Sequence, residues 1–253
     1  MEAMKWIDTH CHLDYSPMFE NIENVKKNME QHNVVGAMSI STTTCTLDKV
    51  YPLLVENNMW CAVGVHPLDE KIVCLDEIEE YFSKWIDKEK VVAIGEAGLD
   101  GYKGNVLDQV PGFELQLQYA EKYKLPFVLH TRDAEKLTLE ILDKYDVMGI
   151  AHCYTGSIEL AKKLLEKGWF ISISGIVTFK NASIVREVAK MIPIKQILVE
   201  TDSPYLAPVP FRGKTNEPAF VSYVGEFVAN LRNMDKEEFA NHTTNNFLNL
   251  INV

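Results

Sequence analysis

The chain has 253 residues, of which 47% are hydrophobic and 24% charged; 36 acidic against 25 basic side chains give a formal net charge of −11. Such a chain can bury one large core, whereas two independent domains would be small at this length. The acidic balance excludes a broad basic surface for nucleic acid, so any contact with a polyanion must be local. We therefore expect residues 1–253 to form one domain.

The cysteines and the N-terminal residues indicate the cellular compartment of the protein. Five cysteines are an odd number and form no Cys-x-x-Cys pair, which argues against a disulfide framework and against a thiolate zinc site. The first twelve residues carry acidic side chains and show neither the apolar segment of a signal peptide nor a membrane span. These features predict a soluble protein of the cytoplasm without a membrane partner, and no feature indicates an obligate protein partner.

Eight short β-rich runs follow one another along the chain, each mostly apolar without clean alternation, as in strands covered on both faces. They are residues 5–9, 34–40, 60–65, 91–95, 126–130, 147–152, 169–174 and 196–201. Apolar stripes at helical spacing predict crossover helices between them: Ile78, Phe82 and Trp85; Phe113, Leu117 and Ala120; Leu137, Ile141 and Tyr145; Ala161 and Leu165 before a stop at Gly168. Residues 205–218, rich in Pro and Gly, predict a long loop after the last strand.

Eight strand–helix units in a chain of this size predict an α/β fold of the (β/α)8 TIM-barrel type, although a doubly wound open sheet would show the same alternation. Side chains that bind divalent metal ions stand at the carboxyl ends of the predicted strands: His10, His12, His66, Glu96, His130, His152 and Asp202. In a barrel these ends form one rim. Even without His66, four imidazoles and two carboxylates would lie close together at that rim. Burying so many polar and charged groups in an apolar barrel is unfavourable unless a bound cation offsets the cost.

Side-chain direction along a strand groups these residues further. His10 and His12, two apart, point the same way and can hold one ion together, and Asp8 is expected to share their direction. On the last strand the same parity places Glu200 and Asp202 inward. Buried Glu200 is then expected to orient a ligand or a water, and the alternative is an ion pair between Glu200 and a lysine deeper in the barrel.

Several stretches resemble the TatD-family metal-dependent deoxyribonucleases, which are barrel enzymes related to the amidohydrolases. They are Ile7-Asp8-Thr9-His10-Cys11-His12, Gly64-Val65-His66-Pro67, Gly95-Glu96-Ala97-Gly98-Leu99-Asp100, Leu129-His130-Thr131-Arg132, Ala151-His152-Cys153-Tyr154-Thr155-Gly156-Ser157, residues 172–181, Glu200-Thr201-Asp202-Ser203-Pro204, and Arg212-Gly213-Lys214 with Asn216-Glu217-Pro218. A single His-x-His motif is a weak indication of a family, but this ordered set of motifs spans nearly the whole chain and is a strong one.

The resemblance implies a metallo-dependent hydrolase with two divalent metal ions, magnesium first and manganese or zinc as alternatives. One ion would be held by His10, His12 and Asp202, the other by His130 and His152, with Glu96 bridging the two. His66 would face the substrate. The implied activity is removal of nucleotides from single-stranded DNA or RNA ends, as by a 3′–5′ exonuclease.

Four side chains are candidates for catalysis: Asp202, Glu96, Glu200 and His66. Asp202 is the candidate general base, because a carboxylate beside the attacking water can take its proton at neutral pH; the alternative is that Asp202 is a ligand only.

Two arginines are candidates for binding phosphate. Arg132 follows His130, and Arg212 lies in the loop after the last strand. The alternative for Arg132 is an ion pair with Asp133.

Two other functions remain open. A barrel hydrolase of a small ester, lactone or amide, or a deacylase of misacylated transfer RNA, would use nearly the same metal chemistry. A non-catalytic metal-binding barrel is more remote, because all six proposed ligands and Glu200 are present.

Overall fold

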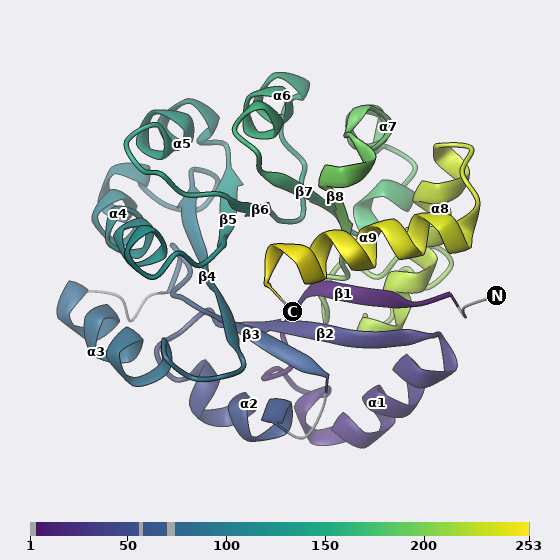
Figure 1. Cartoon of the computed structure of the whole chain (residues 1–253), viewed down its shortest axis with the longest axis horizontal. Coiled ribbons are helices and arrows are strands. Elements are labelled where there is room, and N and C mark those ends of the chain that lie inside the picture. The colour runs from purple at the N-terminus through teal and green to yellow at the C-terminus, as the bar shows by residue number, and fades with distance from the viewer. Residues whose placement is uncertain (1–3, 56–57, 70–73, 253) are drawn as a thin grey trace.

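The computed structural model describes residues 4–55, 58–69 and 74–252. Eight parallel strands form one sheet in the order of the sequence (Figure 1): β1 (Trp6–Cys11), β2 (Val34–Ile40), β3 (Met59–Val63), β4 (Val91–Asp100), β5 (Phe127–Arg132), β6 (Gly149–Ala151), β7 (Phe170–Ile173) and β8 (Ile197–Val199). The helices are α1 (Ile22–Gln31), α2 (Thr46–Val55), α3 (Leu75–Trp85), α4 (Val106–Tyr123), α5 (Glu135–Leu142), α6 (Ile158–Glu166), α7 (Ser183–Met191), α8 (Val221–Leu231) and α9 (Lys236–Leu250).

The sheet closes on itself where β1 meets the segment that follows β8. The Asp202 amide donates to the His10 carbonyl at 2.9 Å, and the His12 amide donates to the Ser203 carbonyl at 2.8 Å. Cys11 and Ser203 form a parallel bridge beside these bonds. The predicted barrel is therefore confirmed, and the open sheet is excluded.

Two apolar layers hold the barrel together. The larger lies between the strands and the surrounding helices, and Trp6 on β1 packs there against Phe239 on α9, with ring centres 6.3 Å apart. The smaller joins side chains of the strands to the end of α9, which crosses one end of the barrel in Figure 1; its buried members are Ile7, Met38, Ile40, Ala62, Val92, Ala93, Val128, Ile150, Leu198, Phe247, Leu250 and Ile251. Strands covered on both faces explain the apolar runs without alternation.

The predicted elements are all present, but some ends differ. β4 continues to Asp100, past the predicted end at residue 95, because polar residues interrupt its apolar run without ending the strand. Tyr145 was expected on the stripe of α5, yet this helix ends at Leu142 and Tyr145 lies in the turn that follows. Gly168, with φ of 84°, follows the end of α6 as predicted. Residues 205–217 form the predicted loop.

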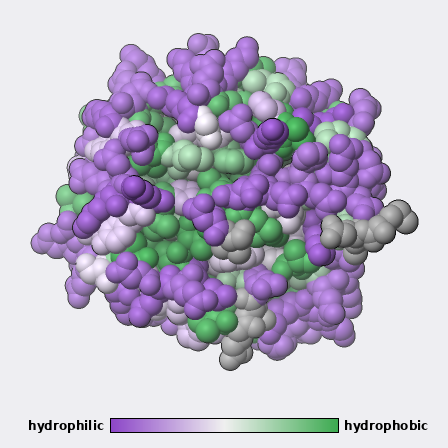
Figure 2. All heavy atoms as spheres, viewed as in Figure 1, coloured by the Kyte–Doolittle hydropathy of each residue, from purple (hydrophilic) through white to green (hydrophobic). Residues whose placement is uncertain are grey.

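The outer surface is mostly hydrophilic on one face of the molecule (Figure 2). Hydrophilic side chains predominate on the face shown in Figure 2, with hydrophobic ones visible between them. Within residues 4–55, 58–69 and 74–252, none of the helices combines the length and the apolar character that crossing a membrane requires.

Candidate metal centre

The metal-binding side chains predicted from the sequence converge at the carboxyl end of the barrel. His10 lies in β1, Glu96 in β4 and His130 in β5, while His12, His66, His152 and Asp202 closely follow β1, β3, β6 and β8. Their ligand atoms form three overlapping groups, each within 4.8 Å: His10, His12 and Asp202; His10, Glu96 and His152; His66, Glu96 and His130. All seven side chains therefore meet in one cluster, although they come from six strands.

Irregular strand pairing places two of these residues. The register of β1 against β2 shifts between residues 8 and 11, which span His10. The register of β4 against β5 shifts between residues 95 and 97, which flank Glu96. An extra residue at such a bulge turns a side chain away from the regular alternation of a strand. The bulges thus set the direction of His10 and Glu96.

Asp8 is not among the grouped ligands. Its carboxylate accepts hydrogen bonds from the Thr201 amide at 2.8 Å and the Thr201 hydroxyl at 2.6 Å. Burial raises the pKa of Asp8 well above its ordinary value, although the bonds from Thr201 oppose that rise. The expectation that Asp8 shares the direction of His10 and His12 is not met, because the bulge in β1 interrupts the alternation.

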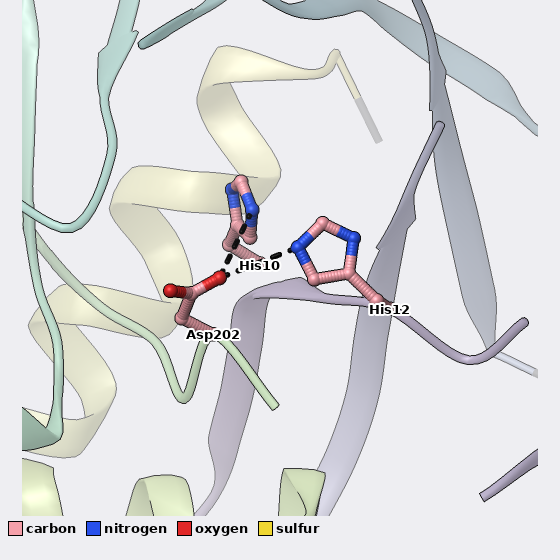
Figure 3. A group of neighbouring side chains, drawn as sticks. All are labelled: His10, His12 and Asp202. Atoms are coloured by element: carbon pink, nitrogen blue, oxygen red, sulfur yellow. Dashed lines mark ion pairs between the residues drawn. The ribbon is translucent and has the colours of Figure 1, made fainter. Parts of the chain in front are cut away.

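One half of the cluster is formed by His10, His12 and Asp202 (Figure 3). Asp202 Oδ1 lies 3.3 Å from His12 Nε2 and 3.6 Å from His10 Nε2. Two ligands that each lie about 2.1 Å from one ion are about 3.0–3.4 Å apart, which is close to these separations and long for a hydrogen bond. The spacing of the three groups therefore fits a shared cation.

Glu96 connects this half to the other. Its Oε2 lies 3.4 Å from His10 Nε2, whereas its Oε1 lies 2.8 Å from both His130 Nδ1 and His152 Nε2. The rings of His10 and His152 stack with centres 4.0 Å apart. A carboxylate whose two oxygens face two different sets of imidazoles is suited to bridge two ions, as the resemblance implied.

The buried ring nitrogens of His10 show whether the cluster fits a metal ion. Its side chain is fully buried, and neither ring nitrogen has a hydrogen-bond partner in the described parts of the chain. Leaving a buried polar atom unpartnered costs about 1–3 kcal/mol, and a cation would supply the partner. Burial also lowers the pKa of His10, which favours the neutral imidazole that binds metal. Imidazoles and carboxylates together accept zinc, manganese or magnesium.

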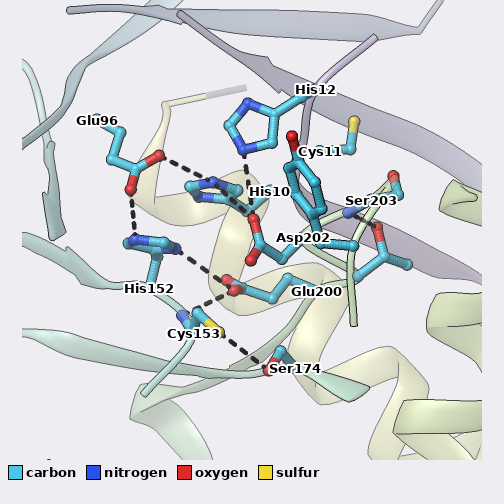
Figure 4. Close-up of polar contacts among 12 residues, drawn as sticks. His10, Cys11, His12, Glu96, His152, Cys153, Ser174, Glu200, Asp202 and Ser203 are labelled. Atoms are coloured by element: carbon cyan, nitrogen blue, oxygen red, sulfur yellow. Dashed lines mark hydrogen bonds and ion pairs between the residues drawn. The ribbon is translucent and has the colours of Figure 1, made fainter. Parts of the chain in front are cut away.

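Glu200 lies behind His152 and is fully buried. Its Oε1 accepts a hydrogen bond from the Cys153 amide at 2.7 Å and lies 3.6 Å from His152 Nδ1 (Figure 4). The alternative of a lysine partner is wrong for the described residues, which place none in ion-pair contact with it. Glu200 therefore holds the backbone beside His152 and faces its outer nitrogen, as a positioning residue does.

His66 has a different partner on each ring nitrogen. Nδ1 accepts a hydrogen bond from the Leu68 amide at 3.0 Å, and Nε2 lies 3.6 Å from Glu96 Oε1. Burial first, and then the neighbouring histidines, lower the pKa of His66 to about 4 against the pull of Glu96. The neutral ring must carry its proton on Nε2, because Nδ1 is an acceptor. In the neutral ring, the bond from the Leu68 amide thus leaves Nε2 as an N–H donor.

Asp100 is a site residue that the sequence analysis missed. Its Oδ2 lies 3.2 Å from His130 Nε2, and its Oδ1 accepts from the amides of Tyr102 and Lys103 at 2.9 Å each. The contact with His130 contributes most to lowering the pKa of Asp100, to about 2. The one available signal was its place at the end of the motif Gly-Leu-Asp, but the predicted strand ended before it.

The two arginines stack on aromatic rings at the same end of the barrel. The Arg132 guanidinium lies 3.8 Å from the ring centre of Tyr102, and the Arg212 guanidinium lies 3.7 Å from that of Phe179. Arg132 makes no ion pair with Asp133, so that alternative is wrong. Stacking holds each guanidinium in place. One N–H group of Arg212 also donates to the Ala207 carbonyl at 3.3 Å, and neither guanidinium is paired with a carboxylate among the described residues.

The comparisons with known proteins agree with this centre. The chain matches the family described as "TatD related DNase" over residues 7–252. The uncharacterized metal-dependent hydrolase YcfH of Escherichia coli (strain K12) is 39% identical over 257 residues, which cover 98% of this chain and 96% of that protein. YabD of Bacillus subtilis (strain 168), also named an uncharacterized metal-dependent hydrolase, is 38% identical over 256 residues, which cover 97% and 98% of the two chains.

Solved structures show the same fold. YJJV, a TatD homologue from Escherichia coli K12, has a TM-score of 0.89 and 29% identity over 98% of both chains. An uncharacterized amidohydrolase from Saccharomyces cerevisiae, 18% identical, reaches a TM-score of 0.83 over 98% of this chain and 100% of its own. Together with the convergence of the ligand groups, these matches establish that the chain is a metal-dependent hydrolase of the TatD family.

Proposed function

We propose that this hydrolase cleaves phosphodiester bonds at the ends of single-stranded DNA or RNA in the cytoplasm. The observation that carries the proposal is the pair Arg132 and Arg212, two exposed guanidinium groups that form no ion pair with a carboxylate in the described part of the chain. In a protein of net charge −11, free arginines at the metal end favour an anionic group bound locally over a long duplex.

Six side chains would hold two divalent ions: His10, His12 and Asp202 the first, His130 and His152 the second, and Glu96 both. Ions bound there would activate a water molecule as the nucleophile and offset the charge of the attacked phosphoryl group. Magnesium is the ion that we propose first.

In this proposal Asp202 accepts the proton of the attacking water. Burial raises the pKa of Asp202, but the close contact with His12 and the neighbouring imidazoles outweigh it, so the pKa lies below its ordinary value. Asp202 is therefore ionised at neutral pH. Both of its ion pairs use Oδ1, which leaves Oδ2 to take the proton (Figure 3).

The remaining residues bind or orient. His66 offers its Nε2 proton to a phosphoryl oxygen, where negative charge increases during attack. Arg132 and Arg212 contact the phosphates of the same strand, and Glu200 keeps His152 in its orientation.

The proposal is tested with end-labelled single-stranded DNA and RNA oligonucleotides incubated with the purified protein and magnesium, manganese or zinc. We expect stepwise shortening from the 3′ end, abolished by a chelator. A panel of lactones and esters and a misacylated transfer RNA are assayed in parallel. Hydrolysis of one of these, with intact oligonucleotides under every metal, would contradict the proposal.

Asp202→Asn supplies the inactive enzyme for this assay. Because it removes the proposed base, we expect kcat to fall by at least about 100-fold with an unchanged circular dichroism spectrum. The matched control is Asp133→Asn, an exposed acid nearby whose φ of 51° suits asparagine. Normal turnover by Asp202→Asn would remove Asp202 from the mechanism.

A further inference from the structure

The exposed aromatic side chains of the chain are distributed unevenly. Of ten tyrosines, three are exposed: Tyr15 at 37%, Tyr102 at 61% and Tyr205 at 52%. All three lie on loops that follow strands, namely β1, β4 and β8, at the metal end of the barrel. The other tyrosines and every phenylalanine and tryptophan are buried or partly buried. Exposed rings gathered at one end of a protein indicate a binding surface.

Tyr15 and Tyr205 form a pair on neighbouring loops. Their ring centres lie 6.0 Å apart with the planes at 71°, an edge-to-face contact. Tyr15 also makes an edge contact with His12, at 5.7 Å between centres. The Tyr205 amide donates to the Asp202 carbonyl at 3.0 Å. The pair is therefore continuous with the half of the centre that His12 and Asp202 form.

The chemistry of the pair distinguishes it from the third exposed tyrosine. A guanidinium already stacks on the Tyr102 ring, whereas no cation stacks on either ring of the pair among the described residues. Each ring keeps part of its surface exposed, 37% for Tyr15 and 52% for Tyr205. Two aromatic rings with exposed surface suit a planar, uncharged heteroaromatic group.

We propose that Tyr15 and Tyr205 form a stacking subsite for the nucleobase of the terminal nucleotide, next to the phosphate at the metal centre. This inference rests on the proposed function and specifies its substrate. Stacking on a ring is tolerant of base identity, because every base has a π-face. It favours an unpaired base, since a paired terminal base is held on its neighbour by the partner strand and cannot turn toward the rings. The subsite therefore selects frayed or single-stranded ends.

The kinetic test compares two oligonucleotides that differ only at the terminal nucleotide, which either carries a base or is an abasic tetrahydrofuran analogue. We expect Tyr15→Ala and Tyr205→Ala to lower kcat/KM for the base-bearing end by about tenfold or more and to leave the abasic end unchanged. Tyr15→Phe and Tyr205→Phe keep the rings and should behave as the parent protein. Val35→Ala, an exposed apolar residue at the opposite end of β2, controls for loss of surface area.

Equal losses on both oligonucleotides would overturn the subsite, because the effect would not depend on the base. Equal cleavage of both ends by the parent protein would also overturn the subsite.

A binding measurement tests the subsite independently of the proposed hydrolysis. An oligonucleotide with phosphorothioate linkages and a fluorescent adenine analogue as its terminal base is titrated with each protein. Quenching by the parent and the phenylalanine variants, weakened about tenfold in the alanine variants, supports the subsite even if no cleavage is found. Quenching retained by the alanine variants overturns it.

Discussion

In the proposed mechanism, His66 lies among the metal ligands but acts as a hydrogen-bond donor to the substrate. Its Nε2 is near enough to Glu96 and His130 to be grouped with them as a potential ligand. The hydrogen bond from the Leu68 amide nevertheless occupies Nδ1 and leaves the proton on Nε2, where a metal would need a lone pair. The backbone partner thus decides between two roles that spacing alone leaves open.

We predict that His66→Ala lowers kcat by about 100-fold, because it removes a preorganised donor to the phosphoryl oxygen. Metal content, measured by elemental analysis, should not change. His66→Gln retains an N–H donor and should recover part of the activity. If the alanine variant loses one equivalent of metal, His66 is a ligand and the assignment of its tautomer is wrong.

Asp100 acts on the centre through His130. It contacts the outer nitrogen of that ring, so it fixes the orientation in which Nδ1 faces Glu96 and His152.

We predict that Asp100→Asn weakens the affinity for the second ion by about 10-fold to 100-fold and spares the first. Titration calorimetry of the metal-free protein should resolve the two binding steps. Asp108→Asn, on the exposed first turn of α4, serves as the control. A uniform loss of both steps would mean that Asp100 supports the fold of the rim rather than His130 alone.

At the scale of the elements, the seam between β1 and β8 combines closure of the barrel with construction of the centre. Backbone bonds of His10 and His12 to residues 202 and 203 close the sheet, and their side chains meet Asp202 across the same seam. Below them, Thr201 binds the buried carboxylate of Asp8 through both its amide and its hydroxyl. The hydroxyl also accepts from the Ser203 amide at 3.1 Å.

We predict that Thr201→Val lowers the free energy of unfolding of the metal-free protein by about 1–3 kcal/mol, because Asp8 and the Ser203 amide each lose a buried hydrogen-bond partner while the volume is kept. Urea denaturation measures the change. Thr215→Val, in the exposed loop, should stay within about 0.5 kcal/mol of the parent. Equal stability of both variants would show that the seam does not depend on the hydroxyl.

Across the whole molecule, the ligand set binds protons and metal in competition. Burial alone would lower the pKa of His12, His130 and His152, but carboxylates outweigh it and raise all three: Asp202 for His12, Asp100 and Glu96 for His130, Glu96 and Glu200 for His152. In the metal-free protein these imidazoles therefore keep their protons to a higher pH than a free histidine does, and a metal must displace those protons. Such groups stabilise the metal-free fold below the ordinary histidine pKa, and that contribution is lost as the pH rises through their raised values.

We predict that the affinity for manganese increases between about pH 6 and about pH 8, by about tenfold per pH unit for each proton released. Calorimetric titrations in buffers of different ionisation enthalpy count the protons. An affinity that is independent of pH, without proton release, would show that the imidazoles are already neutral.

The barrel fold and the clustering of the candidate metal ligands could be predicted because both follow from the repeated strand–helix units. Eight apolar runs separated by helical stripes fit few topologies, and parallel strands bring their carboxyl ends to one rim wherever the exact boundaries lie. Misplacing the end of β4 by five residues therefore did not affect the placement of Glu96 or His130 at that rim.

Contacts that depend on register could not be predicted in this way. The bulge in β1 separates Asp8 from His10 and His12, and it arises from pairing with β2 rather than from the local sequence. Asp100 reaches His130 only because β4 runs on beside β5 to its last residue. The stack of Arg132 on Tyr102 likewise joins the end of β5 to the loop after β4, whose relative positions a single sequence does not reveal.

The seam has a consequence for the lifetime of the folded chain. Its bonds join residues as far as 193 positions apart, nearly the full span of the barrel. A cation held by His10 and Asp202 would therefore cross-link the first strand to the segment after the last one. Unfolding of the barrel would then require release of the cation. The same side chains would then determine both the stability of the folded protein and its catalysis. Depletion of the metal in a cell would shorten the lifetime of the protein as well as stop its turnover.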